Sequence, residues 1–269
     1  MICATCAVEY DGDALPQVCP ICADERQWVP ADGQHWQDLD ALRTAGQRLV
    51  WAEAEPGRVE ITAEPKVGIG QTAQLVHTPG GSLLWDPPGY IDAETVARVR
   101  ALGPVLAVAA SHPHMFGVQT EWGAALQAPV LVCEPDAGWL GRSSDRVQLW
   151  DGDHELTEGL SLHRVGGHFP GAAVALWSAG AGGRGVLLSG DTVFPNPDRS
   201  SVGFLRSYPN KIPLSAAVVE RIAARLAGLQ FDRVVGNFGN AIESGAAAAV
   251  QRSARRHVEW VRGDHDDDT

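Results

Sequence analysis

Four of the chain's five cysteines lie within the first 22 residues, and this clustering strongly constrains how the amino-terminal segment can fold. They form two CxxC pairs, Cys3 with Cys6 and Cys19 with Cys22, separated by twelve residues. Each pair can place two thiolates on one tight turn, so that four sulfurs surround one metal ion tetrahedrally. Because so short a segment cannot bury enough surface to fold alone, we expect a bound metal to supply most of its folding free energy.

Residues 1–30 are therefore interpreted as a structural zinc ribbon with Cys3, Cys6, Cys19 and Cys22 as ligands. The alternative is a rubredoxin-like iron centre that carries electrons, because four thiolates also suit iron. The glycine that commonly follows rubredoxin cysteine pairs is replaced by alanine after both pairs, which favours zinc. The fifth cysteine, Cys133, lies in an apolar run and is expected to be an inert core thiol.

Length and charge narrow the class of protein. The chain has 269 residues, of which 45% are hydrophobic and 20% charged, so it can bury a sizeable core. The net charge of −12 disfavours electrostatically driven binding to nucleic acid. No apolar run approaches the roughly 20 residues of a membrane span, and the first residues lack the features of a signal peptide. We expect a cytoplasmic protein that binds neither nucleic acids nor membranes; the sequence indicates no oligomeric state.

Hydrophobic patterning predicts the organisation of the remaining chain. Residues 31–49 are interpreted as a connector that includes a short helix over 38–48. Strands are expected over 58–62, 74–78, 82–85, 105–110, 130–133, 147–150, 161–164, 174–177, 185–188 and 233–235, and helices over 92–102, 121–126, 213–229 and 242–262. Asp92 is the expected N-cap of its helix. This order predicts an α/β layered sandwich over residues 50–262, and the acidic residues 263–269 are expected to form a disordered tail.

Candidate metal ligands follow three of these strands. His112 and His114 come directly after a buried strand, and side chains two residues apart point the same way in an extended backbone. His168 lies in a glycine-flanked turn, and Asp191 follows another strand in the sequence Ser-Gly-Asp-Thr. Because α/β proteins assemble their sites where strands end in loops, these residues are candidates for a functional site. Taken alone, His112 and His114 could equally be a pair of surface histidines.

The order of the HxH, Gly-Gly-His and Gly-Asp motifs resembles that of the metallo-β-lactamase superfamily, which includes hydrolases of the glyoxalase II type. The resemblance implies an αββα sandwich, preceded here by the zinc ribbon. It also implies a metal-bound water that attacks an ester, thioester, amide, lactone or phosphodiester. On this basis His112, His114 and His168 are expected to hold the first metal ion, and Asp191 corresponds to the carboxylate that usually bridges two ions.

The chain departs from the family pattern HxHxDH at its last two positions. Phe116 and Gly117 stand there, and neither side chain can coordinate a metal ion. A late histidine ligand is also missing from Gly-Asn-Phe-Gly over 236–239. We therefore predict that the sandwich holds either one metal ion, zinc or iron, or none, and not a pair of ions. A zinc ion with an open position brings the pKa of its water to about 7, and Asp191 is the expected catalytic residue, as the base or as the group that holds that water.

The predicted function is a metal-dependent hydrolase of a small-molecule ester, thioester or lactone. Two alternatives stay open. Two histidines with Asp191 form a two-His-one-carboxylate set, which suits non-haem iron and resembles the iron site of persulfide dioxygenases, so the protein is alternatively a mononuclear iron oxidoreductase. Phe116 and Gly117 also fit a catalytically eroded binding or scaffold protein whose ribbon recognises a partner.

Two further positions bear on the site. Asp86 resembles the strand-end aspartate that supports the metal ligands in this family, and it is alternatively a simple turn carboxylate. Tyr208, Asn210 and Lys211 lie in a loop after Asp191 and are candidate substrate contacts.

Overall fold

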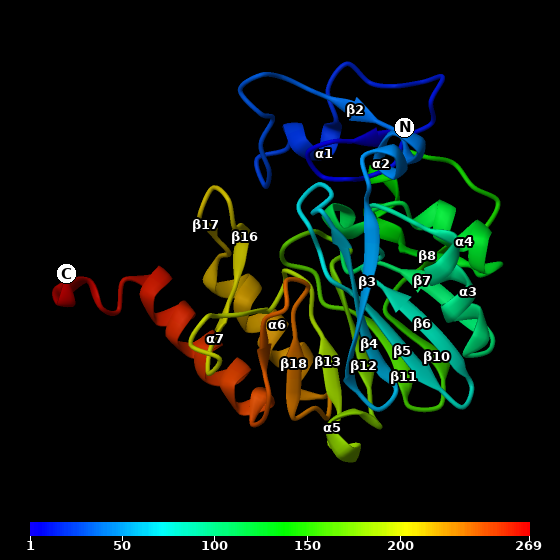
Figure 1. Ribbon diagram of the computed structural model, residues 1–269. Coiled ribbons are helices and arrows are strands. Elements are labelled where there is room, and N and C mark those ends of the chain that lie inside the picture. The colour runs from blue at the N-terminus through cyan, green and yellow to red at the C-terminus, as the bar shows by residue number, and fades with distance from the viewer.

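The computed structural model describes residues 1–269 and contains two β-sheets packed face to face, with helices on their outer sides (Figure 1). The first sheet has seven strands in the order β3 (Arg48–Glu55), β4 (Arg58–Glu64), β5 (Ala73–Thr78), β6 (Gly81–Trp85), β7 (Val105–Ala109), β8 (Val130–Cys133) and β9 (Val147–Trp150). The second has six, in the order β10 (Asp153–Thr157), β11 (Leu160–Arg164), β12 (Ala173–Trp177), β13 (Val186–Leu188), β18 (Arg233–Val235) and β19 (Ala241–Ile242).

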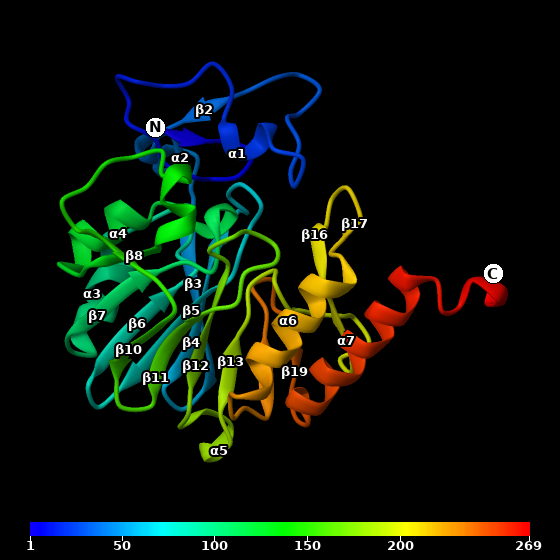
Figure 2. The same ribbon diagram turned by 180° about the vertical axis from the view of Figure 1, so that it is seen from behind.

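Helices cover the outer faces of both sheets. Helices α3 (Ala93–Ala101) and α4 (Gln119–Leu126) lie beside the first sheet, and α6 (Ala216–Ala227) and α7 (Ala246–Arg262) lie beside the second (Figures 1 and 2). The predicted αββα sandwich is therefore confirmed. No helix combines the length and apolar character needed to cross a bilayer.

The remaining elements are short and lie mainly in loops. They are β1 (Ile2–Cys3), α1 (Pro20–Ala23), β2 (Trp36–Gln37), α2 (Leu39–Thr44), η1 (Pro113–Met115), η2 (Glu134–Trp139), α5 (Gly180–Gly183), β14 (Phe194–Pro195), β15 (Val202–Gly203), β16 (Leu205–Ser207), β17 (Ile212–Pro213) and η3 (Asp266–Asp268).

Central strands divide their side chains between an inner and an outer core. On β7, Ala107 and Ala109 belong to the apolar cluster between the sheets, whereas Val108 belongs to the cluster shared with α4. On β13, Leu187 faces the helices α6 and α7 and its two neighbours face inward. Successive strand residues point to opposite faces, so a strand buried on both sides must be apolar throughout. This requirement explains why these strands appear in the sequence as continuous apolar runs.

The ribbon, residues 1–30, lies across one end of the sandwich (Figure 1). Its four paired cysteines belong to the same apolar cluster of 27 buried residues as side chains of β5, β7 and β8. Asn210, from the β16–β17 loop, donates hydrogen bonds to the carbonyls of Glu25 and Gln27 at 2.8 and 3.1 Å. The ribbon and the sandwich are therefore joined by a continuous core and by hydrogen bonds from a side chain of the sandwich to the backbone of the ribbon.

The structure corrects several expected element boundaries. The helix expected over 38–48 ends at Thr44, because Gly46 takes a φ of +85°, and the chain then enters β3 at Arg48. The last helix begins at Ala246 rather than at residue 242, since the preceding pair of residues forms β19 against β18. The acidic tail, expected to be disordered, contains the single turn η3.

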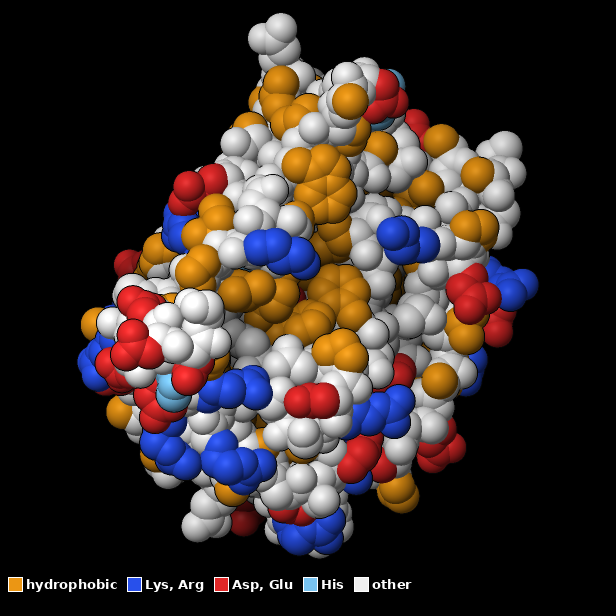
Figure 3. Space-filling model, turned by 90° about the vertical axis from the view of Figure 1, so that its left-hand side faces the viewer, with side chains coloured by type: hydrophobic (Ala, Val, Ile, Leu, Met, Phe, Trp, Pro, Cys, Tyr) orange, Lys and Arg blue, Asp and Glu red, His pale blue; other side chains and the backbone are white.

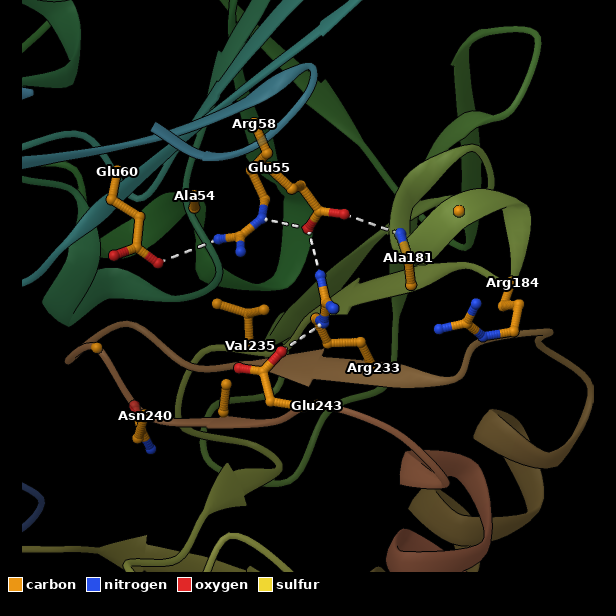
Figure 4. Close-up of a pocket in the computed structure, with 13 residues that line it drawn as sticks. Ala54, Glu55, Arg58, Glu60, Ala181, Arg184, Arg233, Val235, Asn240 and Glu243 are labelled. Atoms are coloured by element: carbon orange, nitrogen blue, oxygen red, sulfur yellow. Dashed lines mark hydrogen bonds and ion pairs between the residues drawn. The ribbon is translucent and has the colours of Figure 1, made fainter. Parts of the chain in front are cut away.

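Away from the ribbon, the half-buried carboxylate of Glu55 joins the two sheets (Figure 4). Glu55 of β3 accepts hydrogen bonds from Arg58 of β4 at 2.9 Å, from Arg233 of β18 at 2.7 Å and from the backbone N–H of Ala181 at 2.9 Å. Burial acts to raise the pKa of Glu55, but these bonds outweigh it and lower that pKa. Glu55, Arg58 and Arg233 line a pocket on this side of the sandwich, and their charges are paired with one another. We therefore interpret this group of side chains as structural.

Glu55→Ala is expected to reduce the free energy of unfolding by about 3 kcal/mol, because it leaves two largely buried guanidinium groups without their shared partner. The change is measured by urea denaturation. Glu53→Ala, which removes an exposed carboxylate from the same strand, is the control and should cost less than about 0.5 kcal/mol. A loss below about 1 kcal/mol for Glu55→Ala would show that the cluster does not hold the sheets together.

Candidate metal centre

The loops at the ribbon end of the sandwich bring together all four predicted ligands of the second metal site. His112 follows β7, His114 lies in η1, His168 lies between β11 and β12, and Asp191 follows β13. All four residues are buried, and their ligand atoms lie within 4.8 Å of one another. This cluster, assembled from three separate segments of chain, has the composition and closeness that a metal site requires.

The spacing of the donor atoms fits one ion. His168 Nε2 lies 3.2 Å from His114 Nδ1, and Asp191 Oδ2 lies 3.6 Å from His112 Nε2 and 3.8 Å from His168 Nε2. Tetrahedral ligands at about 2.0–2.1 Å from zinc are separated by about 3.3–3.4 Å. His112 Nε2 and Asp191 Oδ1 are buried without any hydrogen-bond partner. Buried polar atoms without partners are costly, and a metal ion held by the histidines would satisfy Nε2 of His112.

The protonation states also suit metal binding. Burial lowers the pKa of His112 and His114 well below the ordinary value and lowers that of His168 to about 4. All three imidazoles are therefore neutral at pH 7, which is the form that coordinates metals. Burial raises the pKa of Asp191 to about 7, and the amide of Asn237 acts in the opposite direction.

Hydrogen bonds outside the cluster fix two of the rings. Asp86 accepts from the N–H of Ser111 at 2.6 Å and from its hydroxyl at 3.1 Å, and that hydroxyl lies 2.9 Å from His112 Nδ1. Because the serine proton is directed at the carboxylate, Nδ1–H of His112 donates to the hydroxyl oxygen and Nε2 is left free. His168 likewise donates from Nδ1 to the Leu205 carbonyl at 3.0 Å. Asp86 is thus a supporting residue of the site and not merely a turn carboxylate.

The ribbon cysteines form a second cluster. The four sulfurs lie within 4.8 Å of one another, and Cys3–Cys22 and Cys6–Cys19 are each separated by 3.7 Å. Tetrahedral sulfurs at about 2.3 Å from zinc are about 3.8 Å apart, whereas a disulfide brings them to about 2.0 Å. The geometry therefore matches a metal site with four thiolate ligands and excludes disulfides.

The positions at which the family pattern has two further ligands are used for packing. Phe116 is 3% exposed and belongs to the apolar cluster that contains the ribbon cysteines. Gly117 has a φ of +52°, and a Cβ there would lie 2.4 Å from the Pro87 carbonyl oxygen. Its own carbonyl accepts the N–H of Glu9, from the ribbon, at 3.1 Å. A histidine at position 117 would therefore clash with the backbone of Pro87 and would disturb the contact between this loop and the ribbon.

Two residues beside the cluster were not identified from the sequence as site residues. The guanidinium of Arg26, in the ribbon, lies over the ring of Phe169, with Cζ 3.8 Å from the ring centroid. That ring packs against all three histidines of the cluster. Asn237 is 1% exposed, and neither its amide oxygen nor its amide nitrogen has a hydrogen-bond partner. The only sequence signal for Asn237 is its place at the end of the strand where a late histidine is expected.

A pocket of about 270 Å³ opens onto Asp191. The ribbon contributes Trp28 to its wall, the β4–β5 loop contributes Lys66, and Tyr208 and Phe238 complete it from the other side. Tyr208, a predicted substrate contact, donates its hydroxyl to the Asp191 carbonyl at 3.1 Å and to the Gly203 carbonyl at 3.2 Å. The pocket is therefore assembled from both parts of the chain and reaches the metal cluster.

Comparison with known proteins identifies one relative in sequence. No family model matches the chain. The uncharacterized protein YmaE of Bacillus subtilis (strain 168) is 41% identical over 266 residues, which cover 98% of this chain and 97% of YmaE.

Several solved structures share the fold. A B3 metallo-β-lactamase with an active-site glutamic acid has a TM-score of 0.54 at 16% identity and covers 86% of this chain and 95% of its own. The DIM-1 metallo-β-lactamase has a TM-score of 0.57 at 13% identity, and the match covers 78% of this chain and 98% of DIM-1. A metallo-β-lactamase from Hirschia baltica has a TM-score of 0.55 at 16% identity, and the match covers 78% of this chain and 97% of the Hirschia protein. At these identities the likeness establishes the fold.

Proposed function

Since the chain belongs to the family of the Bacillus subtilis protein YmaE and has the metallo-β-lactamase fold, we propose that it is a metal-dependent hydrolase. The sandwich would hold one zinc ion and the ribbon a second, structural one. The substrate is a small molecule with an ester, thioester or lactone bond. The observation that carries the proposal is the buried cluster of three histidines and Asp191, open to a pocket on the Asp191 side.

The donor set supports zinc in the sandwich. The three histidines His112, His114 and His168 would hold the ion, with Asp191 beside it; an ion with a position open to water would polarise a carbonyl group and make hydroxide available at neutral pH. One ion rather than two is supported by Phe116 and Gly117, since neither side chain coordinates metals and the glycine position has no room for a larger residue. Both residues instead belong to the surface on which the ribbon packs.

The chain's own residues supply the remaining functions. Asp191 has one carboxylate oxygen without a partner, and at neutral pH this oxygen can accept a proton from the attacking water. The amide of Asn237, buried beside Asp191, would favour the ionised form of that carboxylate. Ser111 and the Leu205 carbonyl keep His112 and His168 in orientations that leave their Nε2 atoms free. Arg26 and Phe169 cover the histidines from the ribbon side.

The test combines elemental analysis with a substrate panel. Protein purified without a tag and under anaerobic conditions is expected to contain two zinc ions per chain. It is then assayed on matched aryl esters, thioesters and lactones, with Asp191→Asn as the comparison variant. We expect hydrolysis of at least one class, and a fall of about 100-fold or more in kcat/KM for the variant.

Other metal contents would replace the proposal with a stated alternative. One zinc and one iron ion per chain, without hydrolysis, would favour an iron oxidoreductase whose ion is held by two of the histidines and Asp191. A single zinc ion, bound by the cysteines, would mean that the histidine cluster is empty and that the sandwich is a binding module.

A further inference from the structure

The pocket beside Asp191 has a composition that favours one chemical class of substrate. Its walls are mainly apolar and aromatic, and they include Trp28, Ile69, Phe194 and Phe238. Trp28 and Phe238 are 47% and 40% exposed, which is unusual for side chains of this size. Figure 3 shows hydrophobic side chains gathered in a hollow on this face of the molecule, with basic side chains on either side. Such a surface fits a flat, apolar group.

Only two charged residues line this pocket, Lys66 and Asp191. Asp191 belongs to the metal cluster, and its charge would be neutralised there. Lys66 is an exposed residue that lines this pocket, and its ammonium group has no ion-pair or hydrogen-bond partner in a chain with a net charge of −12. An ammonium group left unpaired in the wall of an apolar pocket is available to an anion from outside the protein.

The stem of Lys66 is held against its own loop. A Cβ on Gly70 would lie 2.3 Å from both Cγ and Cδ of Lys66, so these methylene groups lie directly over the glycine backbone. Gly70 also has a φ of +76°, which glycine adopts without strain. The loop thus places the stem of Lys66 along the pocket wall, and this arrangement requires a glycine at position 70.

The chain contains one other lysine, and it provides an internal comparison. Lys211 lines a neighbouring pocket of about 500 Å³, and Phe194 and Tyr208 form the partition that the two pockets share. Like Lys66, it has no ion-pair partner. Only the pocket that contains Lys66 includes a residue of the metal cluster.

We propose that this pocket binds a substrate with a flat apolar body and an anionic group, a carboxylate or sulfonate, and that Lys66 pairs with the anion while Trp28 packs on the apolar body. This inference deepens the proposed function, because it assigns the substrate class of the same site. It also assigns the ribbon a role in recognition, since Trp28 comes from the ribbon.

The test is a binding measurement that does not depend on turnover. Naphthalene-2-sulfonate and its neutral analogue methyl 2-naphthyl sulfone are titrated into the metal-loaded protein by calorimetry. We expect the sulfonate to bind about fivefold more tightly than the sulfone. Lys66→Met should abolish this preference, whereas Lys66→Arg and Lys211→Met should keep it. Trp28→Ala should weaken both probes by a similar factor.

A further titration separates this inference from the proposed function. In His168→Ala, which is expected to lose the sandwich metal, the preference for the anion should persist because it comes from Lys66. Persistence there, combined with a failure of every hydrolysis assay, would leave the pocket assignment intact and reject the hydrolase. Equal affinity for the two probes in the unaltered protein, or a preference that survives Lys66→Met and disappears in His168→Ala, would overturn the assignment.

Discussion

His112→Ala is expected to lower the metal content from two ions per chain to one and to abolish hydrolysis. Nε2 of His112 is one of the buried atoms without a partner, and no neighbouring side chain can replace it in the cluster. Loss of an outer hydrogen-bond partner typically costs about 10–100-fold in metal affinity or activity, and loss of a ligand should cost more. Elemental analysis and kcat/KM for the best substrate of the panel measure the two effects.

Two further variants are expected to have smaller effects than His112→Ala. Ser111→Ala keeps the ligand but removes the hydroxyl that orients it, so we expect a loss of about 10–100-fold in activity with the metal retained at saturating zinc. His77→Ala is the control, because it removes an imidazole of the first sheet that lies outside the cluster. If His112→Ala retained both metal ions, the assignment of the cluster as a metal site would be wrong.

Cys22→Ser is expected to destabilise the whole protein and not only the ribbon. Cys22 is 1% exposed, and all four clustered cysteines share an apolar core with the first sheet. Zinc supplies much of the folding free energy of sites of this kind, so losing the ion removes support from the sandwich as well. A loss of about 4 kcal/mol would lower Tm by about 8–16 °C in a chain of this size.

Thermal unfolding and the zinc content test the role of the ribbon together. Cys133→Ala is the matched control, since Cys133 is also a buried cysteine, 5% exposed, but lies on β8 outside the sulfur cluster. It should keep all its zinc and lose only about 1–2 kcal/mol. If Cys22→Ser lost its ribbon zinc without any change in the Tm of the sandwich, the two parts would be energetically independent, contrary to the shared core.

Local patterns were sufficient for most of the sandwich. The helix over 92–102 was located by Asp92, which caps α3 by accepting the N–H of Thr95 at 2.7 Å. Strand β3 was missed because its side chains alternate weakly, with most of them exposed or half-buried, and its start was assigned to a helix. Its residues are held by pairing with β4 and not by a buried face of their own.

The metal clusters were predictable for a different reason. Cysteine and histidine are rare, and short spacings such as those in Cys3/Cys6 and His112/His114 limit the geometry so strongly that the ligands can be named before the fold is known. No comparable spacing marks the supporting residues. Ser111 and Asn237 are ordinary polar residues in the sequence, and only their burial against the cluster distinguishes them.

The sequence by itself therefore determined the layers of the sandwich, the two groups of candidate metal ligands and the absence of coordinating side chains at positions 116 and 117. The tertiary structure alone decided what surrounds those ligands. It placed Arg26 on Phe169, Trp28 and Lys66 in the wall of one pocket, and the ribbon on the surface that Phe116 and Gly117 provide. The physical reason is the separation of the residues along the chain. Periodicity and ligand spacing relate residues that are close in sequence, whereas these contacts join distant segments that only the packed core brings together.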